Sequence, residues 1–254
     1  MKFRRLLFVG LIFFILHVGG CTSKKFTTDS LRHMTATELL YQGTVNLKKE
    51  NYTDAIRYLE SIDALYPFSP EVDQGQLAVI YAYHQTGNSN SALAAATRYI
   101  HLHPESSHTD YAYYMKGIIN LSKDRIRAQK ILTRKLEDLD ISLLNEAFIY
   151  FSELIKKFPR SIYAHDAQTK MFYIKHTIAE HELNIAKFYL KREAHVAAAN
   201  RAIYIVKHFK NIPQLKDALK IMIHSYDALG LTEFRDNTIE AFRFNFPKDN
   251  LREI

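Results

Sequence analysis

Histidine occurs twelve times in this chain of 254 residues, and its side chain is the one here best suited to bind a transition metal. Two pairs lie close in the sequence, His101 with His103 and His176 with His181. On a helix, a spacing of two residues turns side chains about 200° apart, and a spacing of five also misses a shared face. Neither pair therefore predicts a metal site, and we expect these histidines to lie on the surface or in a groove.

Sequence motifs typical of catalysis do not occur in this chain. It contains no Gly-x-Ser-x-Gly, no His-Glu-x-x-His and no glycine-rich phosphate loop. Its only cysteine, Cys21, follows an N-terminal apolar segment, so no thiol remains for chemistry in the folded part. The sequence therefore favours a protein that is not an enzyme and needs no cofactor.

Cys21 is the residue for which the sequence predicts a covalent modification. Residues 1–20 are ordered like an export signal, with a basic start and an apolar stretch from Leu6 to Val18 that is shorter than the roughly 20 residues of a membrane span. The stretch ends in Val18-Gly19-Gly20-Cys21, which resembles a bacterial lipobox, where a signal peptidase cuts before a cysteine that carries a diacylglycerol. We expect a signal peptide over residues 1–20, then an acylated N-terminus and tether over residues 21–35. An ordinary secretory signal or a short anchor is the alternative.

The expected lipid on the sulfur and amine of Cys21 would hold the protein on a membrane, since each buried methylene contributes about 0.8 kcal/mol. Thr22 stands where an aspartate retains inner-membrane lipoproteins of enteric-type bacteria, so by resemblance we expect the periplasmic face of the outer membrane. Removing residues 1–20 lowers the formal net charge from +7 to about +4, because the segment holds three basic and no acidic residues. So small and mixed a charge gives little support to a nucleic-acid partner.

Aromatic and amide side chains at helical spacing form the candidate binding groove. Rings with hydroxyl tips suit an extended peptide, because the rings cover side-chain surface while hydroxyls and amides satisfy backbone groups. Packing between helices is the alternative role for any single tyrosine. Two expected helices present the groove residues on one face, the first contributing Gln74, Leu77, Tyr81 and His84 and the second contributing Tyr111, Tyr114 and Ile118.

The elements that position these residues are predicted by a helix-turn-helix unit in the middle of the sequence. An amphipathic helix is expected from about Val72 to Gln85, with a turn at Gly87 and a second helix from about Ser91 to His101 that ends before Pro104. A small residue, Ala92, lies twelve positions before that proline, where two crossing helices can approach closely. This spacing is typical of the tetratricopeptide repeat.

Copies of the unit recur along the chain. The marker pairs are Ala55 with Pro67, Ala92 with Pro104, Ala147 with Pro159, Ala198 with Lys210 and, more weakly, Arg235 with Pro247. The end markers are 37, 55, 51 and 37 residues apart, and the repeated value of 37 favours a solenoid over an ordinary helical bundle. We therefore predict an all-α tetratricopeptide repeat solenoid of about five helix-turn-helix repeats, wound as a right-handed superhelix.

The unequal spacings predict how the repeats are divided. Residues 36–121 hold repeats 1 and 2 and the first helix of repeat 3, and residues 122–141 form a charged insert, basic first and acidic later. Residues 142–161 complete repeat 3, whose second helix we expect Ser142 to cap. Residues 162–254 hold a linking helix, capped by Ser161 and ending near Arg192, and repeats 4 and 5. We expect this helix to act as a rigid spine between two partner surfaces.

Several short segments together resemble one known family. They are Tyr66-Pro67-Phe68, Gln76-Leu77, Tyr81-Ala82-Tyr83, Asp110-Tyr111, Tyr114-Met115-Lys116-Gly117, Asp124-Arg125, Ala147-Phe148, Tyr163-Ala164-x-Asp166-Ala167, Tyr189-x-x-Arg192 and Val196-Ala197-Ala198-x-Asn200-Arg201-Ala202. With the lipobox and the repeats, they resemble the BamD (ComL) family of outer-membrane β-barrel assembly lipoproteins over nearly the whole mature chain. Lys116, Glu193 and Lys210 depart from the family's usual arginine, glycine and proline, which leaves the turns of repeat 4 in question.

The resemblance implies a non-enzymatic subunit of the machine that assembles β-barrel proteins in the outer membrane. N-terminal repeats would receive unfolded outer-membrane proteins, and C-terminal repeats would dock the periplasmic domains of the core barrel subunit, with accessory lipoproteins also bound. The predicted groove falls in the first region. Tyr189, Arg192, Asn200 and Arg201 fall in the second, where Arg201 could donate paired hydrogen bonds to a partner carboxylate or could simply be an exposed helix arginine.

Two other kinds of protein remain as alternatives at this point. A pilotin-type tetratricopeptide lipoprotein that assembles a pilus or secretion secretin would share the lipobox and the repeats. A scaffold for an envelope enzyme, or a peptidoglycan hydrolase, is more distant, because no pair of acidic residues lies in a recognisable catalytic context. Loss of piliation without loss of outer-membrane barrels would favour the first alternative, and turnover of cell-wall fragments the second.

Overall fold

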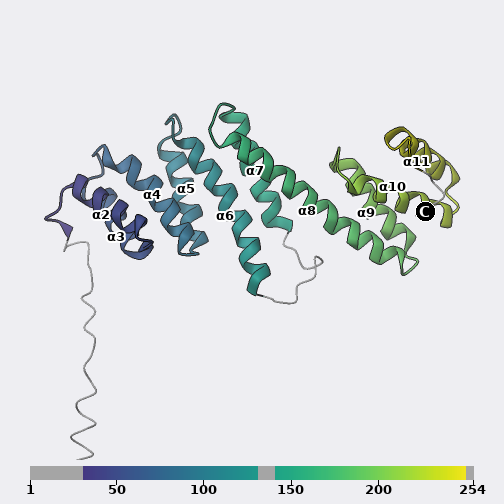
Figure 1. Ribbon diagram of the computed structural model, residues 1–254, viewed down its shortest axis with the longest axis horizontal. Coiled ribbons are helices and arrows are strands. Elements are labelled where there is room, and N and C mark those ends of the chain that lie inside the picture. Colours follow the sequence, from purple (N-terminus) through teal and green to yellow (C-terminus); the bar gives the residue numbers. More distant parts are fainter. Residues whose placement is uncertain (1–30, 131–140, 250–254) are drawn as a thin grey trace, which may run out of the picture.

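The computed structural model describes residues 31–130 and 141–249, and these residues form an elongated array of helices with no strand among them (Figure 1). Each helix packs against its neighbours in chain order, so that α2 and α11 lie at opposite ends. The predicted signal peptide, Cys21 and most of the tether lie outside the described residues, as do residues 131–140 of the predicted insert. The helices are α2 (Ala36–Lys48), α3 (Tyr52–Leu65), α4 (Glu71–Gln85), α5 (Ser89–Leu102), α6 (Thr109–Lys130), α7 (Ile141–Lys157), α8 (Ala164–Leu190), α9 (His195–His208), α10 (Gln214–Ala228) and α11 (Thr232–Asn245).

The helices form successive packed pairs, which confirms the predicted all-α solenoid of the tetratricopeptide type. The pairs are α2 with α3, α4 with α5, α6 with α7, α8 with α9 and α10 with α11. In the first four pairs the small marker residue of the second helix is completely buried, as close helix crossing requires. These markers are Ala55, Ala92, Ala147 and Ala198, each 0% exposed. In the fifth pair the marker is Arg235, which instead forms ion pairs with Asp227 and Asp236.

Glycines in two first helices show how close the helices approach. A Cβ atom added to Gly117 on α6 would lie 2.5 Å from the ring of Phe151 on α7, and one added to Gly43 on α2 would lie 2.6 Å from the Leu59 side chain on α3. Both distances are shorter than carbon atoms tolerate, so any larger residue would push the paired helices apart. Gly43 lies twelve residues before the small marker Ala55, so both helices of this pair have a small residue where they meet.

One turn geometry joins the two helices of four repeats. A residue with positive φ stands two positions before the second helix, and these residues are Glu50, Gly87, Glu193 and Gly230, with φ of 59°, 74°, 58° and 69°. In each turn its N–H donates to the carbonyl three residues back, and the next N–H donates to the carbonyl five residues back, at 2.9 to 3.1 Å. This is the Schellman motif, which satisfies the last carbonyls of a helix. Glu193 therefore keeps the turn geometry of Gly87 and Gly230 although it carries a Cβ atom.

The connection after repeat 4 differs from the ends of repeats 1, 2 and 5. Tyr66, His103 and Phe246 end their helices with ψ of 54° to 63°, and each is followed by proline. Phe209, which precedes Lys210, has ψ of 119°, and Asn211 then has a φ of 59°. Lys210 therefore stands in a differently built link, which ends at Pro213 directly before α10.

Two helices in the middle of the chain are longer than the rest. Helix α6 has 22 residues and continues past Leu121 to Lys130, so part of the predicted insert is helical. Helix α8 has 27 residues, or about 40 Å at 1.5 Å per residue. Ser161 does not cap α8 as expected; its hydroxyl donates to Asp110 Oδ2 at 2.6 Å and accepts from the Tyr163 N–H at 3.1 Å. Ser142 lies inside the first turn of α7 rather than before it.

The core of the solenoid consists of three groups of buried residues. One joins α2, α3 and the first half of α4, and a second joins α4, α5 and α6. The third is much larger and runs without interruption from Tyr113 on α6, through α7, α8, α9 and α10, to Phe242 on α11. None of the helices described here is long and apolar enough to cross a membrane.

Candidate functional site

The structure places three of the seven predicted groove residues in one open pocket of about 610 Å³. Gln74 and Leu77 reach it from α4, and Tyr111 reaches it from α6. The opposite wall comes from the link between α7 and α8, where Arg160 and Tyr163 lie. The pocket therefore combines amide, aliphatic and aromatic side chains from α4, α6 and the link between α7 and α8.

Tyr114 lies behind this pocket and supports its wall. Its ring stacks on Tyr163 with 4.8 Å between ring centroids and 21° between the planes. Its hydroxyl donates to Asp166 Oδ2 on α8 at 2.6 Å, and burial, followed by this bond, raises the pKa of the phenol. Burial also raises the pKa of Tyr111, whose ring lies 5.7 Å from Tyr163. Both hydroxyls therefore stay protonated and neutral at physiological pH.

Tyr81 and His84 lie further along α4 and do not line the pocket. Tyr81 is partly exposed, and the edge of its ring meets Tyr52 of α3 at 6.2 Å and 77°. His84 is half-buried, and this burial lowers its pKa, which favours the neutral imidazole. Tyr81 and His84 therefore lie outside the pocket, nearer the C-terminal end of α4.

The C-terminal candidate residues gather in part. Tyr189 of α8 and Asn200 and Arg201 of α9 line a pocket of about 520 Å³ together with Glu182, Ala197 and Tyr204. Arg192 does not line it, because its guanidinium lies over the Phe188 ring at 4.2 Å. Three of the four predicted docking residues therefore share one surface depression.

Arg201 has a partner within the chain that the sequence did not reveal. Its Nη1 lies 3.1 Å from Oε2 of Glu182 on α8, and the Glu182 side chain is only 8% exposed whereas that of Arg201 is 45% exposed. A buried carboxylate needs such a partner, since an unpaired charge away from water is costly. Arg201 therefore neutralises Glu182 and has only part of its guanidinium left for another protein.

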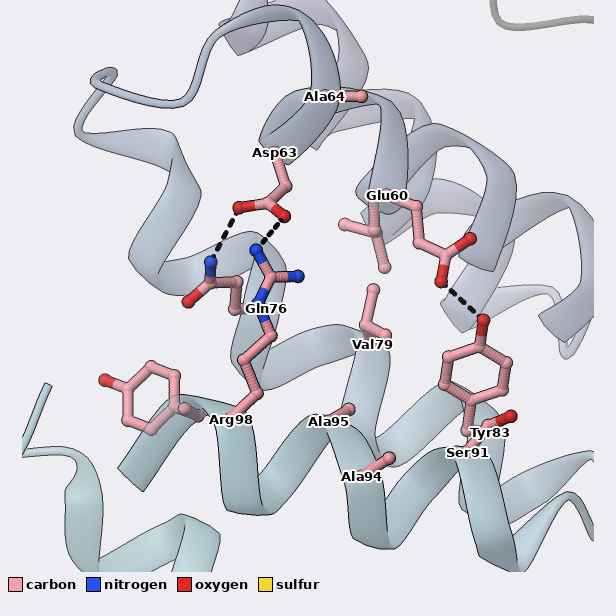
Figure 2. A pocket seen from close by; sticks show the side chains of 12 residues that line it. Glu60, Asp63, Ala64, Gln76, Val79, Tyr83, Ser91, Ala94, Ala95 and Arg98 are labelled. Atoms are coloured by element: carbon pink, nitrogen blue, oxygen red, sulfur yellow. Dashed lines mark hydrogen bonds and ion pairs between the residues drawn. The ribbon is translucent and has the colours of Figure 1, made fainter. Parts of the chain in front are cut away.

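A third pocket, of about 390 Å³, lies between α3, α4 and α5, and sequence analysis missed it (Figure 2). Asp63 accepts hydrogen bonds from Gln76 Nε2 at 2.7 Å and from Arg98 Nη2 at 2.6 Å. Glu60 accepts a hydrogen bond from the Tyr83 hydroxyl. The only signal in the sequence was the pair of acidic residues one turn apart on α3, which is common on solvated helices.

Potential metal ligands do not gather in the part of the chain that the structure describes. Over residues 31–130 and 141–249, no three His, Cys, Asp or Glu side chains come together as a metal site would need. With helix pairs throughout and pockets of about 390 to 610 Å³ on its surface, the described chain is a helical-repeat solenoid of the tetratricopeptide type.

Comparison with known proteins places this solenoid in a family. Residues 32–241 match the family model YfiO, described as an outer membrane lipoprotein. The chain is 34% identical over 212 residues to a protein of Neisseria meningitidis serogroup A, which covers 83% of this chain and 79% of the relative. Identity is 32% over 226 residues with a Vibrio cholerae protein (89% and 92% covered) and 32% over 231 residues with one of Haemophilus influenzae (91% and 87% covered). Each of the three is named outer membrane protein assembly factor BamD.

The chain therefore belongs to the YfiO family of outer membrane lipoproteins, and the resemblance to the BamD family seen in its sequence is confirmed. The match covers all ten described helices except the end of α11.

Proposed function

We propose that this chain is a non-enzymatic lipoprotein subunit of the machinery that assembles β-barrel proteins in the outer membrane. The observation that carries the proposal is the family match over residues 32–241, which includes both the groove of the N-terminal repeats and the pocket of the C-terminal repeats. The chain would sit on the periplasmic face of the outer membrane, held by acyl chains on Cys21.

The N-terminal groove supports a role in receiving unfolded barrel proteins. Its walls combine apolar and ring surface from Leu77, Tyr111 and Tyr163 with the amide of Gln74. An extended peptide needs both, because its side chains seek apolar surface and its unpaired backbone groups seek donors and acceptors. The groove is open to solvent rather than enclosed, so it could accept chain segments of varied sequence.

The C-terminal pocket supports a role in docking the periplasmic domains of the core barrel subunit. Tyr189, Asn200 and Tyr204 offer aromatic surface and an exposed amide, the kind of side chains that anchor protein interfaces. Accessory lipoproteins could bind the remaining surface of the same repeats. The two sites lie near opposite ends of α8, one beside Tyr163 and the other beside Tyr189, so substrate and core subunit could be held at the same time.

Depletion of the protein in its native cell tests the function as a whole. If the proposal is correct, folded outer-membrane barrels fall in amount, and a tagged copy recovers a large barrel subunit with periplasmic domains. Unchanged barrels with recovery of a secretin would instead favour the pilotin reading, and recovery of a cell-wall enzyme would favour the scaffold reading.

Matched substitutions test the two sites separately. Leu77→Asp should reduce crosslinking of the protein to an unfolded barrel substrate, whereas Gln85→Ala, at the exposed end of the same helix, should not. Tyr189→Ala with Asn200→Ala should reduce recovery of the core subunit, whereas Tyr173→Ala, an exposed tyrosine on the same helix as Tyr189, should not. Reversal of Arg201 alone is a poorer test, because it also places two carboxylates together at Glu182.

The lipid anchor is tested at its own residue. Cys21→Ala should release the protein from the outer-membrane fraction, and mass spectrometry of the natural N-terminus should show an acylated cysteine. Retention of the Cys21→Ala protein in that fraction would contradict lipid anchoring but would leave the two binding sites to be judged by the substitutions above.

A further inference from the structure

The pocket between α3, α4 and α5 lies on the other side of α4 from the proposed substrate groove. Helix α4 gives Gln74, Leu77 and Ala78 to the groove and Gln76, Val79 and Tyr83 to this pocket. At about 100° per residue these two sets face directions about 180° apart. The pocket is therefore a separate surface, which the function proposed above does not use.

The centre of this pocket is apolar. Leu59 and Val79 line its floor and are 1% and 7% exposed. Ala94 and Ala95 of α5 form a low wall beside Val79 (Figure 2). The small side chains leave room for an aliphatic chain to lie on the floor, and burial of each methylene of that chain would be favourable.

The two polar ends of the pocket differ in how their charges are balanced. At one end Asp63 and Arg98 form an ion pair at 2.6 Å, and Gln76 donates to the second oxygen of Asp63 at 2.7 Å. At the other end Glu60 is held by the neutral hydroxyl of Tyr83 (Figure 2). Burial and the Glu60 bond raise the pKa of Tyr83 to about 12, so this hydroxyl stays a donor at physiological pH.

The lining therefore has a formal charge of −1, from two carboxylates and one guanidinium. The nearby cation Arg57, one turn before Glu60 on α3, forms an ion pair with Asp54 at 3.1 Å. A carboxylate held in place at the edge of an apolar floor matches a side chain with an aliphatic stem and a cationic head.

We propose that this pocket binds an arginine side chain presented by an extended segment of a partner protein. The aliphatic stem of that arginine would lie on Leu59 and Val79, and its guanidinium would donate to the carboxylate of Glu60. Arginine fits because its planar fork can serve both the Glu60 oxygens and the acceptor lone pair of the Tyr83 hydroxyl. Tyr83 acts as a positioning residue that holds Glu60 over the floor.

Peptide titration of the full mature protein in detergent, with its leucine and valine methyl groups labelled for NMR, tests this proposal. The probe is the pentapeptide acetyl-Gly-Ser-Arg-Ser-Gly-amide, and the matched probe has neutral citrulline in place of arginine. We expect saturable shifts of the Leu59 and Val79 methyl signals with the arginine peptide and about fivefold weaker binding of the citrulline peptide.

Two variants sharpen the test. Glu60→Gln should reduce binding of the arginine peptide to the citrulline level, while Glu233→Gln, an exposed glutamate on α11, should leave it unchanged. Tyr83→Phe should weaken arginine binding while leaving citrulline binding unchanged. Equal binding of the two peptides, unshifted Leu59 and Val79 signals, or full arginine binding by Glu60→Gln would overturn the proposal. Because no barrel assembly is measured, the result is independent of the function proposed above.

Discussion

Repeats 1 and 2 at one end of the solenoid and repeats 4 and 5 at the other share one turn geometry but differ in their side-chain hydrogen bonds and in the size of their buried cores. In the N-terminal repeats, tyrosine, glutamine and arginine side chains donate to carboxylates of other helices. These bonds join Tyr83 to Glu60, Tyr99 to Asp73, Gln76 to Asp63 and Arg98 to Asp63. In the C-terminal repeats the donors are lysine, arginine and glutamine, in bonds that join Lys187 to Asp217, Arg201 to Glu182 and Gln214 to Glu180.

The buried residues follow the same division. Two small groups of buried residues join helices α2 to α6, whereas one continuous group joins helices α6 to α11. In a solenoid each repeat is stabilised mainly by its neighbours, so a smaller shared core means easier local opening. The N-terminal end, which we propose receives unfolded chains, is therefore also the end that we expect to open more readily.

Truncation of the core should produce the largest effect and should separate the two ends. Phe151→Ala removes a completely buried ring from the large core and should cost about 3 to 5 kcal/mol. Leu59→Ala removes a buried side chain from the N-terminal core and should cost about 2 to 3 kcal/mol. Hydrogen exchange should show that Phe151→Ala loosens α6 to α11 together, whereas Leu59→Ala loosens only α2 to α4. Equal loss of protection in α9 and α10 with Leu59→Ala would show that the ends are not independent.

Ion pairs between helices provide a second test, because the two ends differ in how far the carboxylate of the pair is buried. Arg201→Met leaves the carboxylate of Glu182 buried without its cation and should destabilise the protein by about 2 kcal/mol, since Arg201 itself is half exposed. Arg98→Met breaks a pair with Asp63 that is exposed to solvent and should cost about 0.5 kcal/mol or less. Urea unfolding measures both. The double variant Glu182→Gln with Arg201→Met should recover most of the loss, and failure to recover would mean that Arg201 acts through packing instead.

Substitutions in the shared turn should change the free energy of unfolding by a smaller amount, and replacing its glutamates with glycine should stabilise the protein. Glu50 and Glu193 hold a left-handed conformation that costs a residue with a Cβ about 1 to 2 kcal/mol. Because glycine loses more backbone entropy on folding, Glu193→Gly should stabilise the protein by a net amount of about 0.5 kcal/mol. Glu50→Gly should act alike, and Gly230→Ala should destabilise. Thermal unfolding midpoints check all three, and a lower midpoint for both glycine variants would show that the glutamate side chains stabilise these turns.

High pH should lower the stability of the N-terminal repeats. Burial is the main cause that raises the pKa of Tyr83 and of Tyr99 to about 12, from an ordinary value of 10.0. The folded state therefore binds these protons more tightly than the unfolded state, so the stability they contribute is complete below pH 10 and is lost as the pH rises towards 12. Tyr83→Phe should weaken this pH dependence, as measured by urea unfolding across that range. An unchanged slope would mean that Tyr83 titrates alike in both states.

Much of the fold could be predicted because its signals are local. A small residue and a position twelve residues later recur along the chain, and Ala55, Ala92, Ala147 and Ala198 all proved to be buried contact points. Turn geometry was harder to predict, because the hydrogen bonds at Glu193 come from the backbone and tolerate a glutamate. The start of α8 was predicted wrongly, because Ser161 bonds to Asp110, a residue 51 positions earlier in the chain.

The candidate sites could be predicted only in part, because each is built from several repeats. Helical periodicity correctly gathered Gln74 and Leu77 on one face of α4, but the wall at Tyr163 depends on how repeat 3 stacks on repeat 2. The partner of Arg201 was missed because Glu182 lies on another helix, 19 residues away. The pocket at Glu60 depends on the width left between α3 and α5, which no sequence spacing encodes.

Helix α8 should make the connection between repeats 3 and 4 stiff. Its buried residues run from Ala164 to Ala186. The helix is uninterrupted over this length and packs against α7, α9 and α10. A bend between repeats 3 and 4 would have to break backbone hydrogen bonds inside this continuous helix, whereas a flexible linker could bend without breaking any. A force applied at the proposed docking pocket should therefore rotate the proposed substrate groove with it, because the two are joined by one stiff helix.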